Sequence, residues 1–316
     1  MKIQLKFKSL IMHILLLAVC AVSVFVSVLG SKLTTSDLYV VIPNTSSETW
    51  WSLICGALLV LFVSMVILIN SIQGVVLRQN VVLPSLIYAI SVSRLLPSYG
   101  VDDTLLSALS LAFMLYATEI AVVKQNDNGP VFWVGLMAVT ASLFAPKMVV
   151  IAPLSILLLA TMGRFTLKDI SALFVGWVAA LVFAGTTAYA CGTLEPITER
   201  WRAVLFSCPE IGFDSVGEWG RLALTIVTVL ILTVVAVTKF SSQIYTTRRI
   251  MGIYIMVMVS LLLSALIFGG VGYNMWYVMS VPVATVLAYT YVNTGSRVVK
   301  LILYLYLLAN IWPSNL

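Results

Sequence analysis

The sequence predicts an all-α, polytopic integral membrane protein with about 11 transmembrane helices (range about 9–12). Apolar residues make up 61% of the 316 residues and charged residues only 9%, whereas a soluble domain carries roughly 25% charged residues. Apolar runs of about 20 residues, the length that crosses a bilayer, follow one another along nearly the whole chain. Positive charges fall mainly in alternate connections between these runs, which is the pattern that orients membrane helices.

The first apolar run, residues 9–30, follows Lys2, Lys6 and Lys8. A secretory signal peptide begins in the same way, but this run is long for one, so we expect a retained first helix. The other expected helices are 51–77, 81–98, 104–123, 131–145, 147–163, 169–190, 221–238, 250–269, 274–292 and 297–312. They leave no room for a soluble domain, so residues 1–316 are predicted to form a single transmembrane domain.

Two of these segments are short for a membrane span. Residues 131–145 and 147–163 would reach roughly 23 and 26 Å, against a hydrocarbon core of about 30 Å. They are interpreted as two short spans or as a re-entrant hairpin with its tip at Phe144–Lys147, and two short spans are favoured. In a re-entrant hairpin, Lys147 would lie at depth and would need a partner.

The distribution of charge predicts a cytoplasmic N-terminus and an external C-terminus. Each connection assigned to the cytoplasm contains lysine or arginine, while the long loop 191–220 contains many of the acids. We therefore expect a multi-pass protein of the bacterial inner membrane, and the net charge of +6 does not indicate a nucleic-acid partner. Within the loop, Glu195–Leu205 is expected to form an amphipathic helix on the external interface.

Cysteine and histidine usage excludes several kinds of site. The chain has one histidine, His13, which excludes an HExxH zinc protease and sites that need several histidines. No CxxC motif and no GxxxxGK[ST] phosphate loop occurs. Cys191 and Cys208 share the long loop, so an external disulfide is a possible pairing; the alternative is a Cys191 buried at a helix end.

Two charged residues lie within predicted spans, where charge is costly. Arg94 and Glu119 are each about 6 Å from opposite interfaces, hence roughly 18 Å apart and too far for an ion pair. Glu119 is expected to reach toward the interface near Lys124. Arg94 is expected to pair with Asp102 or Asp103 at the start of the next helix.

The external polar residues form a candidate site. Carboxylates bind divalent metals or act as general bases, which makes Asp37, Asp102 and Asp103 the candidate catalytic residues. Basic side chains hold phosphate oxygens, and the candidates for this role are Arg94, Arg200, Arg202 and Lys147. Together they suit a substrate with a pyrophosphate head and a lipid tail. The alternative is a set of solvated loops whose charges do not converge.

Short apolar motifs carry a first family resemblance. They are Leu83-Pro84-Ser85-Leu86-Ile87-Tyr88, Phe132-Trp133-Val134-Gly135-Leu136, Ser142-Leu143-Phe144-Ala145-Pro146 and Arg164-Phe165 with Lys168-Asp169. With these motifs, the stretch 80–192 resembles an uncharacterised integral-membrane family of Gram-negative bacteria. That resemblance implies no established reaction.

A looser resemblance is to the glycosyltransferase C fold, on the positions of Asp37 and Asp102-Asp103 after successive spans. It implies transfer or polymerisation of lipid-linked sugars at the external face, with a polyprenyl-phosphate-linked donor, a lipid-linked glycan as partner and a divalent metal as cofactor. Asp37 lacks the adjacent second acid of that fold. The alternatives are a transporter or flippase for an amphipathic substrate, expected to depend on Glu119, Asn70 or Gln73, and a non-catalytic membrane subunit or scaffold.

Overall fold

The computed structural model describes residues 46–73, 82–93, 95, 102–206, 216–240, 244–267 and 275–311. These residues form eleven α-helices and one short 3₁₀ helix, and none of them lies in a strand. The predicted all-α class is therefore confirmed. The elements are α2 (Ser46–Gln73), α3 (Leu83–Ser93), α5 (Asp103–Val123), α6 (Gly129–Phe144), η2 (Pro146–Met148), α7 (Ile151–Met162), α8 (Leu167–Ala190), α9 (Leu194–Phe206), α10 (Val216–Phe240), α11 (Tyr245–Ile267), α12 (Trp276–Asn293) and α13 (Arg297–Ile311).

Every predicted apolar helix that falls on the described residues is present, whereas the run 9–30 lies outside them. The bounds differ mainly where a helix begins with polar residues. α2 starts at Ser46, five residues before the expected 51, because serine and the acidic Glu48 suit a helix N-terminus although they are not apolar. The amphipathic helix expected at 195–205 is also present, as α9.

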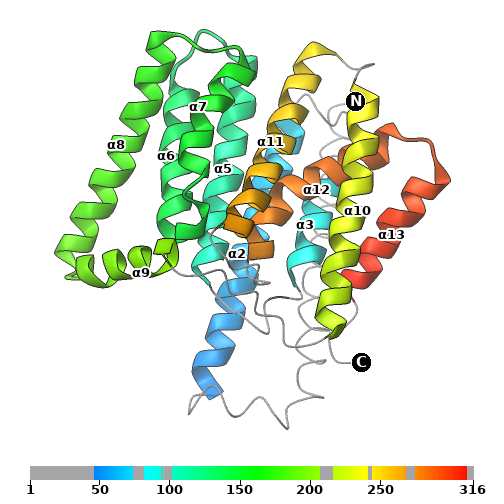
Figure 1. Cartoon of the computed structure of the whole chain (residues 1–316), viewed down its shortest axis with the longest axis horizontal. Helices are drawn as coiled ribbons and strands as arrows, with labels where there is room; N and C mark the ends of the chain where they lie inside the picture. Colours follow the sequence, from blue (N-terminus) through cyan, green and yellow to red (C-terminus); the bar gives the residue numbers. More distant parts are fainter. Residues whose placement is uncertain are drawn as a thin grey trace, which may run out of the picture.

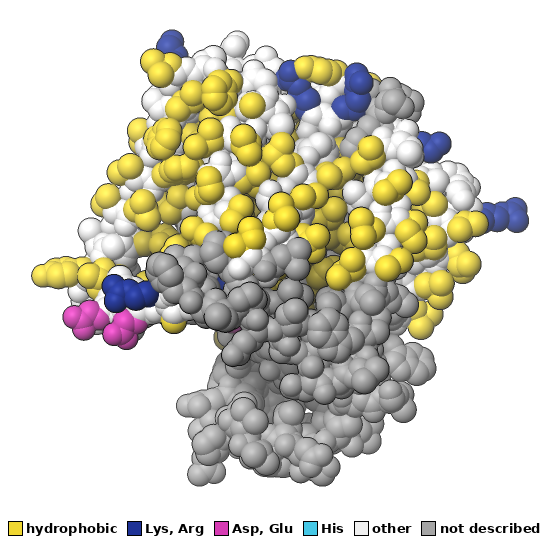
Figure 2. All heavy atoms as spheres, viewed as in Figure 1, with side chains coloured by type: hydrophobic (Ala, Val, Ile, Leu, Met, Phe, Trp, Pro, Cys, Tyr) yellow, Lys and Arg dark blue, Asp and Glu magenta, His cyan; other side chains and the backbone are white. Residues whose placement is uncertain are grey.

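Four helical segments are long and apolar enough to cross a membrane by length and composition. They are Ile54–Ile72 of α2, Asp103–Val123, Leu167–Ala190 and Tyr245–Ala265 of α11, in a search confined to the described residues. Shorter apolar helices include α3, α6 and the segment Pro146–Met162. Apolar side chains are spread over the described surface seen in Figure 2, with lysine and arginine at its margins. The composition and these helices support a membrane-associated protein.

The helices run side by side between two ends of the molecule (Figure 1). α5 lies at the centre and packs against α2, α6, α11 and α12, while α6 lies between α5 and α8. The loops 124–128 and 163–166 lie at one end, which we call the Arg164 face, and the loop 294–296 lies at one side of the molecule, where α12 meets α13. η2 and the crossing helix α9 lie at the opposite end, which we call the Lys147 face.

α6 and α7 form an antiparallel pair that runs between both faces alongside α5 and α8 (Figure 1). Their connection contains η2, which packs against α9 after the end of α8. Lys147 is half-buried in this connection. The structure thus shows two short apolar helices joined by η2.

Close backbone contact joins α6 to α8. A Cβ added at Gly135 would lie 2.4 Å from the carbonyl oxygen of Leu173, and one added at Gly176 would lie 2.3 Å from that of Phe132. No side chain fits at either distance, so glycine is what allows the two helices to approach. α8 is otherwise little covered, with only 17% of its span buried.

Candidate functional site

Three polar side chains from three helices meet inside the helical bundle. The Asn70 side-chain amide on α2 donates to the Tyr254 hydroxyl on α11 at 2.6 Å. The Tyr254 hydroxyl donates in turn to Oε1 of Glu119 on α5 at 2.8 Å. We call Asn70, Glu119 and Tyr254 the Glu119 cluster. It links side chains of α2, α5 and α11.

Glu119 is only 6% exposed. Its second oxygen, Oε2, has no hydrogen-bond partner among the described residues, and no lysine or arginine of the described chain forms an ion pair with it. The expectation that Glu119 reaches toward the interface at Lys124 is therefore wrong. Successive helical residues are about 100° apart, so five residues place the two side chains on different sides of α5, and Glu119 turns toward α11.

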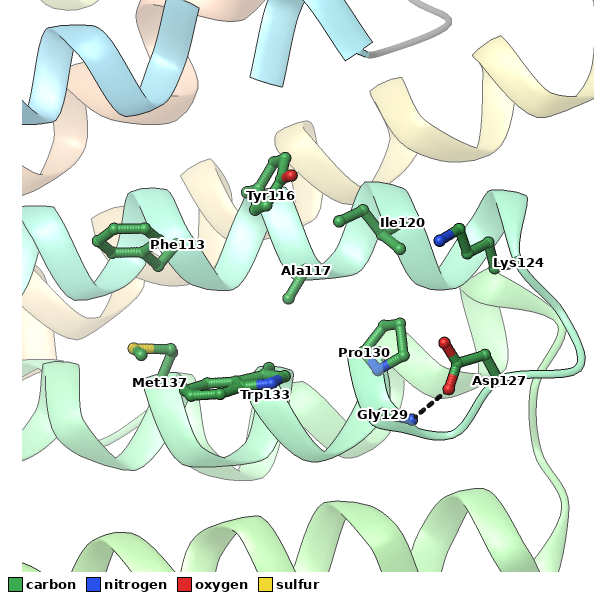
Figure 3. Close-up of a pocket in the computed structure, with 10 residues that line it drawn as sticks. All are labelled: Phe113, Tyr116, Ala117, Ile120, Lys124, Asp127, Gly129, Pro130, Trp133 and Met137. Carbon is green, nitrogen blue, oxygen red and sulfur yellow. Dashed lines mark hydrogen bonds between the residues drawn. The ribbon is translucent and has the colours of Figure 1, made fainter. Parts of the chain in front are cut away.

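A groove between α5 and α6 lies on another side of α5. Its volume is about 620 Å³, within the 300–1,000 Å³ typical of ligand sites. The apolar part is lined by Phe113, Tyr116, Ala117, Ile120, Pro130, Trp133 and Met137. Lys124, Asp127 and Gly129 line one end of the groove, at the Arg164 face (Figure 3).

The helical period separates the groove from the Glu119 cluster. Groove residues of α5 recur at spacings of three and four, which is one face of a helix. Phe113 and Ile120 lie near the middle of that face, and at about 100° per residue Glu119 points roughly 110° away from it. Glu119 thus lies on a different side of α5 from the groove. α5 therefore lines an apolar groove with one face and turns a buried carboxyl to another.

A buried arginine fixes the loop at the polar end of the groove. The Arg164 guanidinium, 3% exposed, pairs with Asp169 at 2.7 Å. It also donates to the carbonyl oxygens of Ala121 (3.4 Å), Lys124 (3.0 Å) and Asp127 (2.8 Å) and to Oδ1 of Asn128 (2.9 Å). A cation at these carbonyls satisfies the C-terminal end of α5 and complements its dipole.

At the Lys147 face, the structure brings together two of the sequence-predicted site residues. Burial lowers the pKa of Lys147 below its usual range, and the nearby Asp102 carboxylate acts in the opposite direction. Asp102 precedes α5 and accepts a hydrogen bond from the Thr104 hydroxyl at 2.7 Å, while Asp103 is the first residue of the helix. Asp102 and Lys147 are therefore electrostatic neighbours.

The other predicted site residues are not brought to this pair. Asp37, Arg94 and Cys208 lie outside the described residues. Arg200 and Arg202 both lie on α9, where the Arg202 side chain is exposed. Cys191 is free and exposed just after α8, so its pairing with Cys208 remains a prediction. None of the predicted site residues lines the α5–α6 groove as described.

In the described part of the chain, no group of three histidine, cysteine, aspartate or glutamate side chains is placed to hold a metal ion. Asp102 and Asp103 are adjacent carboxylates, and a metal would require a further ligand from elsewhere. The Asp102 carboxylate is instead close enough to Lys147 to oppose the lowering of the lysine pKa by burial.

Sequence reasoning did not identify the structural roles of Arg164, Asp169 and Tyr254. The motif Thr166-x-x-Asp169 is a helix N-terminal signal, and Asp169 N–H indeed donates to the Thr166 hydroxyl at 3.2 Å, but it does not reveal Arg164 as the ion-pair partner. Tyr254 carries no local signal. It meets Glu119 across 135 residues of sequence, and such a contact depends on tertiary packing.

Comparison with known proteins assigns the chain to a family but not to an activity. Residues 5–311 match a family described as Family of unknown function (DUF6427). No curated protein and no solved structure matches the chain.

Proposed function

The chain belongs to the DUF6427 family, and for this member we propose a function in moving an amphipathic, lipid-like substrate through the membrane. The observation that carries the proposal is the Glu119 cluster. An ionisable group inside a membrane helix is costly, and such groups usually face a substrate, ion or proton path. Glu119 is buried and retains an oxygen without a partner in the described chain.

The chemistry of the cluster suits a polar head group that crosses the membrane. Donation runs in one direction, from Asn70 to Tyr254 to Glu119, so the carboxyl is the terminal acceptor. Its Oε2 is available to a proton or to an N–H or O–H of a substrate. The cluster lies only one helical turn, about 6 Å, from the end of α5, which places this step close to the Arg164 face rather than at the midplane.

The proposal includes a membrane arrangement: about 11 spans in a bacterial inner membrane, with the N-terminus and the Arg164 face in the cytoplasm and the C-terminus outside. Exposed basic residues support this orientation. Lys124 and Lys168 lie at the loops 124–128 and 163–166, and Arg248 is next to Arg249, which donates to the Met162 carbonyl oxygen at 3.0 Å; the exposed acids Glu195 and Glu199 lie instead on α9.

Transbilayer movement of a fluorescent phospholipid tests the function. Purified protein is placed in vesicles labelled in both leaflets, and an impermeant reductant bleaches the outer leaflet. The rate of inner-leaflet bleaching should rise with the wild-type protein. It should fall at least about tenfold with Glu119→Gln, which is equivalent to about 1.4 kcal/mol of barrier.

Ser91→Ala is the matched control, because it also removes a buried interhelical hydrogen bond, the 3.0 Å contact between Ser91 and Tyr306. Its rate should stay near wild type. Wild-type vesicles that bleach no faster than protein-free ones, or a Glu119→Gln protein that matches wild type, would show that the proposal is wrong.

A second candidate function is transfer of a sugar from a polyprenyl-phosphate-linked donor at the Lys147 face. The proximity of Asp102 and Lys147 favours it, since a carboxylate beside an ammonium can serve as a base next to a phosphate holder. The test is turnover of a radiolabelled lipid-linked sugar with and without a divalent metal. Asp102→Asn should abolish turnover, and Asp127→Asn at the opposite face should not. Turnover that survives Asp102→Asn excludes this role.

A further inference from the structure

The α5–α6 groove combines an apolar channel with two charges of opposite sign at one end (Figure 3). Phe113 and Met137 lie at the apolar end, and Tyr116 and Trp133 lie along the channel. Lys124 and Asp127 lie where the channel meets the Arg164 face. One wall of the groove is α5, which is one of the helices long and apolar enough to cross a membrane.

The length of the channel matches one leaflet of a bilayer. From Phe113 to Lys124, α5 rises about 16 Å at 1.5 Å per residue. The hydrocarbon core is about 30 Å thick, so one leaflet contributes about half of it. A lipid tail that lies in the groove would therefore start at the charged end and reach the middle of the membrane.

The two charges at the groove end remain separate from each other. Among the described residues, the ion pair in this region is Arg164–Asp169, and Lys124 and Asp127 do not pair with each other. Asp127 uses one carboxylate oxygen to accept from Gly129 N–H at 3.0 Å. Arg164 holds the backbone carbonyls of both residues, which fixes their spacing.

Burial of the tail does not explain selective binding. Lipid tails are as apolar as the groove, so an acyl chain gains little by leaving the bilayer for it. Any preference must come from the head group. A phosphate would lie against the Lys124 ammonium, and an adjacent primary ammonium would lie against the Asp127 carboxylate.

We propose that the α5–α6 groove is a binding site for one phospholipid of the Arg164-face leaflet, whose head group carries both a phosphate and a primary amine. The tail lies between α5 and α6, with the phosphate at Lys124 and the amine at Asp127. A head group without an amine lacks the partner for Asp127. This assignment stands independently of whether the protein moves its substrate.

Native mass spectrometry of the purified full-length protein tests the site, with phosphatidylethanolamine and phosphatidylglycerol as probes at equal concentration. The wild-type protein should retain phosphatidylethanolamine at least about fivefold more than phosphatidylglycerol, a differential of about 1 kcal/mol. Asp127→Asn should reduce this ratio to about one. Asparagine keeps an oxygen for Gly129 N–H, so the turn is preserved. Lys124→Gln should weaken retention of both lipids.

Lys168→Gln is the control, because Lys168 is exposed at the same face but does not line the groove. Its ratio should equal that of wild type. A phosphatidylethanolamine probe with a photoreactive group in its tail locates the lipid, and its crosslinks should map to residues 113–137. Equal retention of both lipids by wild type, an unchanged ratio in Asp127→Asn, or crosslinks that map elsewhere would each overturn the proposal.

Discussion

Arg164 is the residue whose loss should affect the fold most. It is buried, it pairs with Asp169, and it binds three backbone carbonyls. A buried ion pair contributes little net stability as a whole, but removal of one partner leaves the other charge uncompensated. The position therefore tolerates arginine and little else, because a planar fork with five donors is needed to reach carboxylate and carbonyls together.

Arg164→Gln should lower the free energy of unfolding by about 3–5 kcal/mol, because Asp169 would stay buried without a cation. Thermal unfolding of the detergent-solubilised protein measures this as a large drop in the midpoint. Arg248→Gln, at an exposed position of the same face, should leave the midpoint nearly unchanged. Equal midpoints for the two variants would contradict the structural role given to Arg164.

At the scale of helices, α6 and α8 depend on two glycines for their contact. Each helix contributes one, and each faces a backbone carbonyl of the other helix. A carbonyl cannot move aside as a flexible side chain does, so any added carbon must separate the helices. Separation would also uncover α6, which connects α8 to the rest of the bundle.

Gly135→Ala and Gly176→Ala should each destabilise the α6–α8 contact by several kcal/mol, because a Cβ would lie 2.4 or 2.3 Å from a carbonyl oxygen. Gly185→Ala on α8 is the matched control, since a Cβ there meets nothing within 4 Å and alanine favours a helix. Thermal unfolding should give lower midpoints for the first two variants and an equal or higher midpoint for the third. A common midpoint would disprove the close contact.

Helix positions followed from apolar run length, but helix contacts did not. The runs predicted α5 and α8 to within about two residues because spans of that length have few alternative structures in a membrane protein. The Glu119–Tyr254 contact depends on which helices become neighbours and on their rotation, which a nearly uniform apolar composition does not encode. The prediction for Glu119 was wrong because it considered only the separation of Glu119 and Lys124 along the helix. The two side chains also point in different directions around the helix axis.

At the scale of the whole molecule, alternating charge in the sequence becomes separation of charge between two ends. Lys124, Arg164 and Lys168 come from two connections that lie side by side at one face. The external site was less predictable. Asp102 and Lys147 approach each other because α5 and the α6–α7 connection are neighbours, whereas Arg202 belongs to a helix that crosses the bundle end.

Single cysteines at the two faces should be accessible from opposite sides of the membrane. In a background with the four native cysteines replaced by serine, Lys168→Cys and Arg202→Cys are labelled in sealed, oriented vesicles with an impermeant thiol reagent. Positive-inside orientation predicts that Lys168→Cys reacts only from the cytoplasmic side and Arg202→Cys only from the other. Reaction of both from one side would rule out the proposed arrangement.

Arg164 holds its loop through three main-chain oxygens and the Asn128 side chain, so the Lys124 side chain takes no part in that contact. The Lys124 carbonyl oxygen accepts a hydrogen bond from Arg164 at the end of α5, while the Lys124 side chain lines the groove, where its ammonium can bind a ligand. Lys124→Gln, and Asp127→Asn with its acceptor for Gly129 N–H retained, should therefore change ligand preference with little change in stability. The protein carries a binding site that can be re-specified, by mutation or by design, without rebuilding the scaffold that presents it.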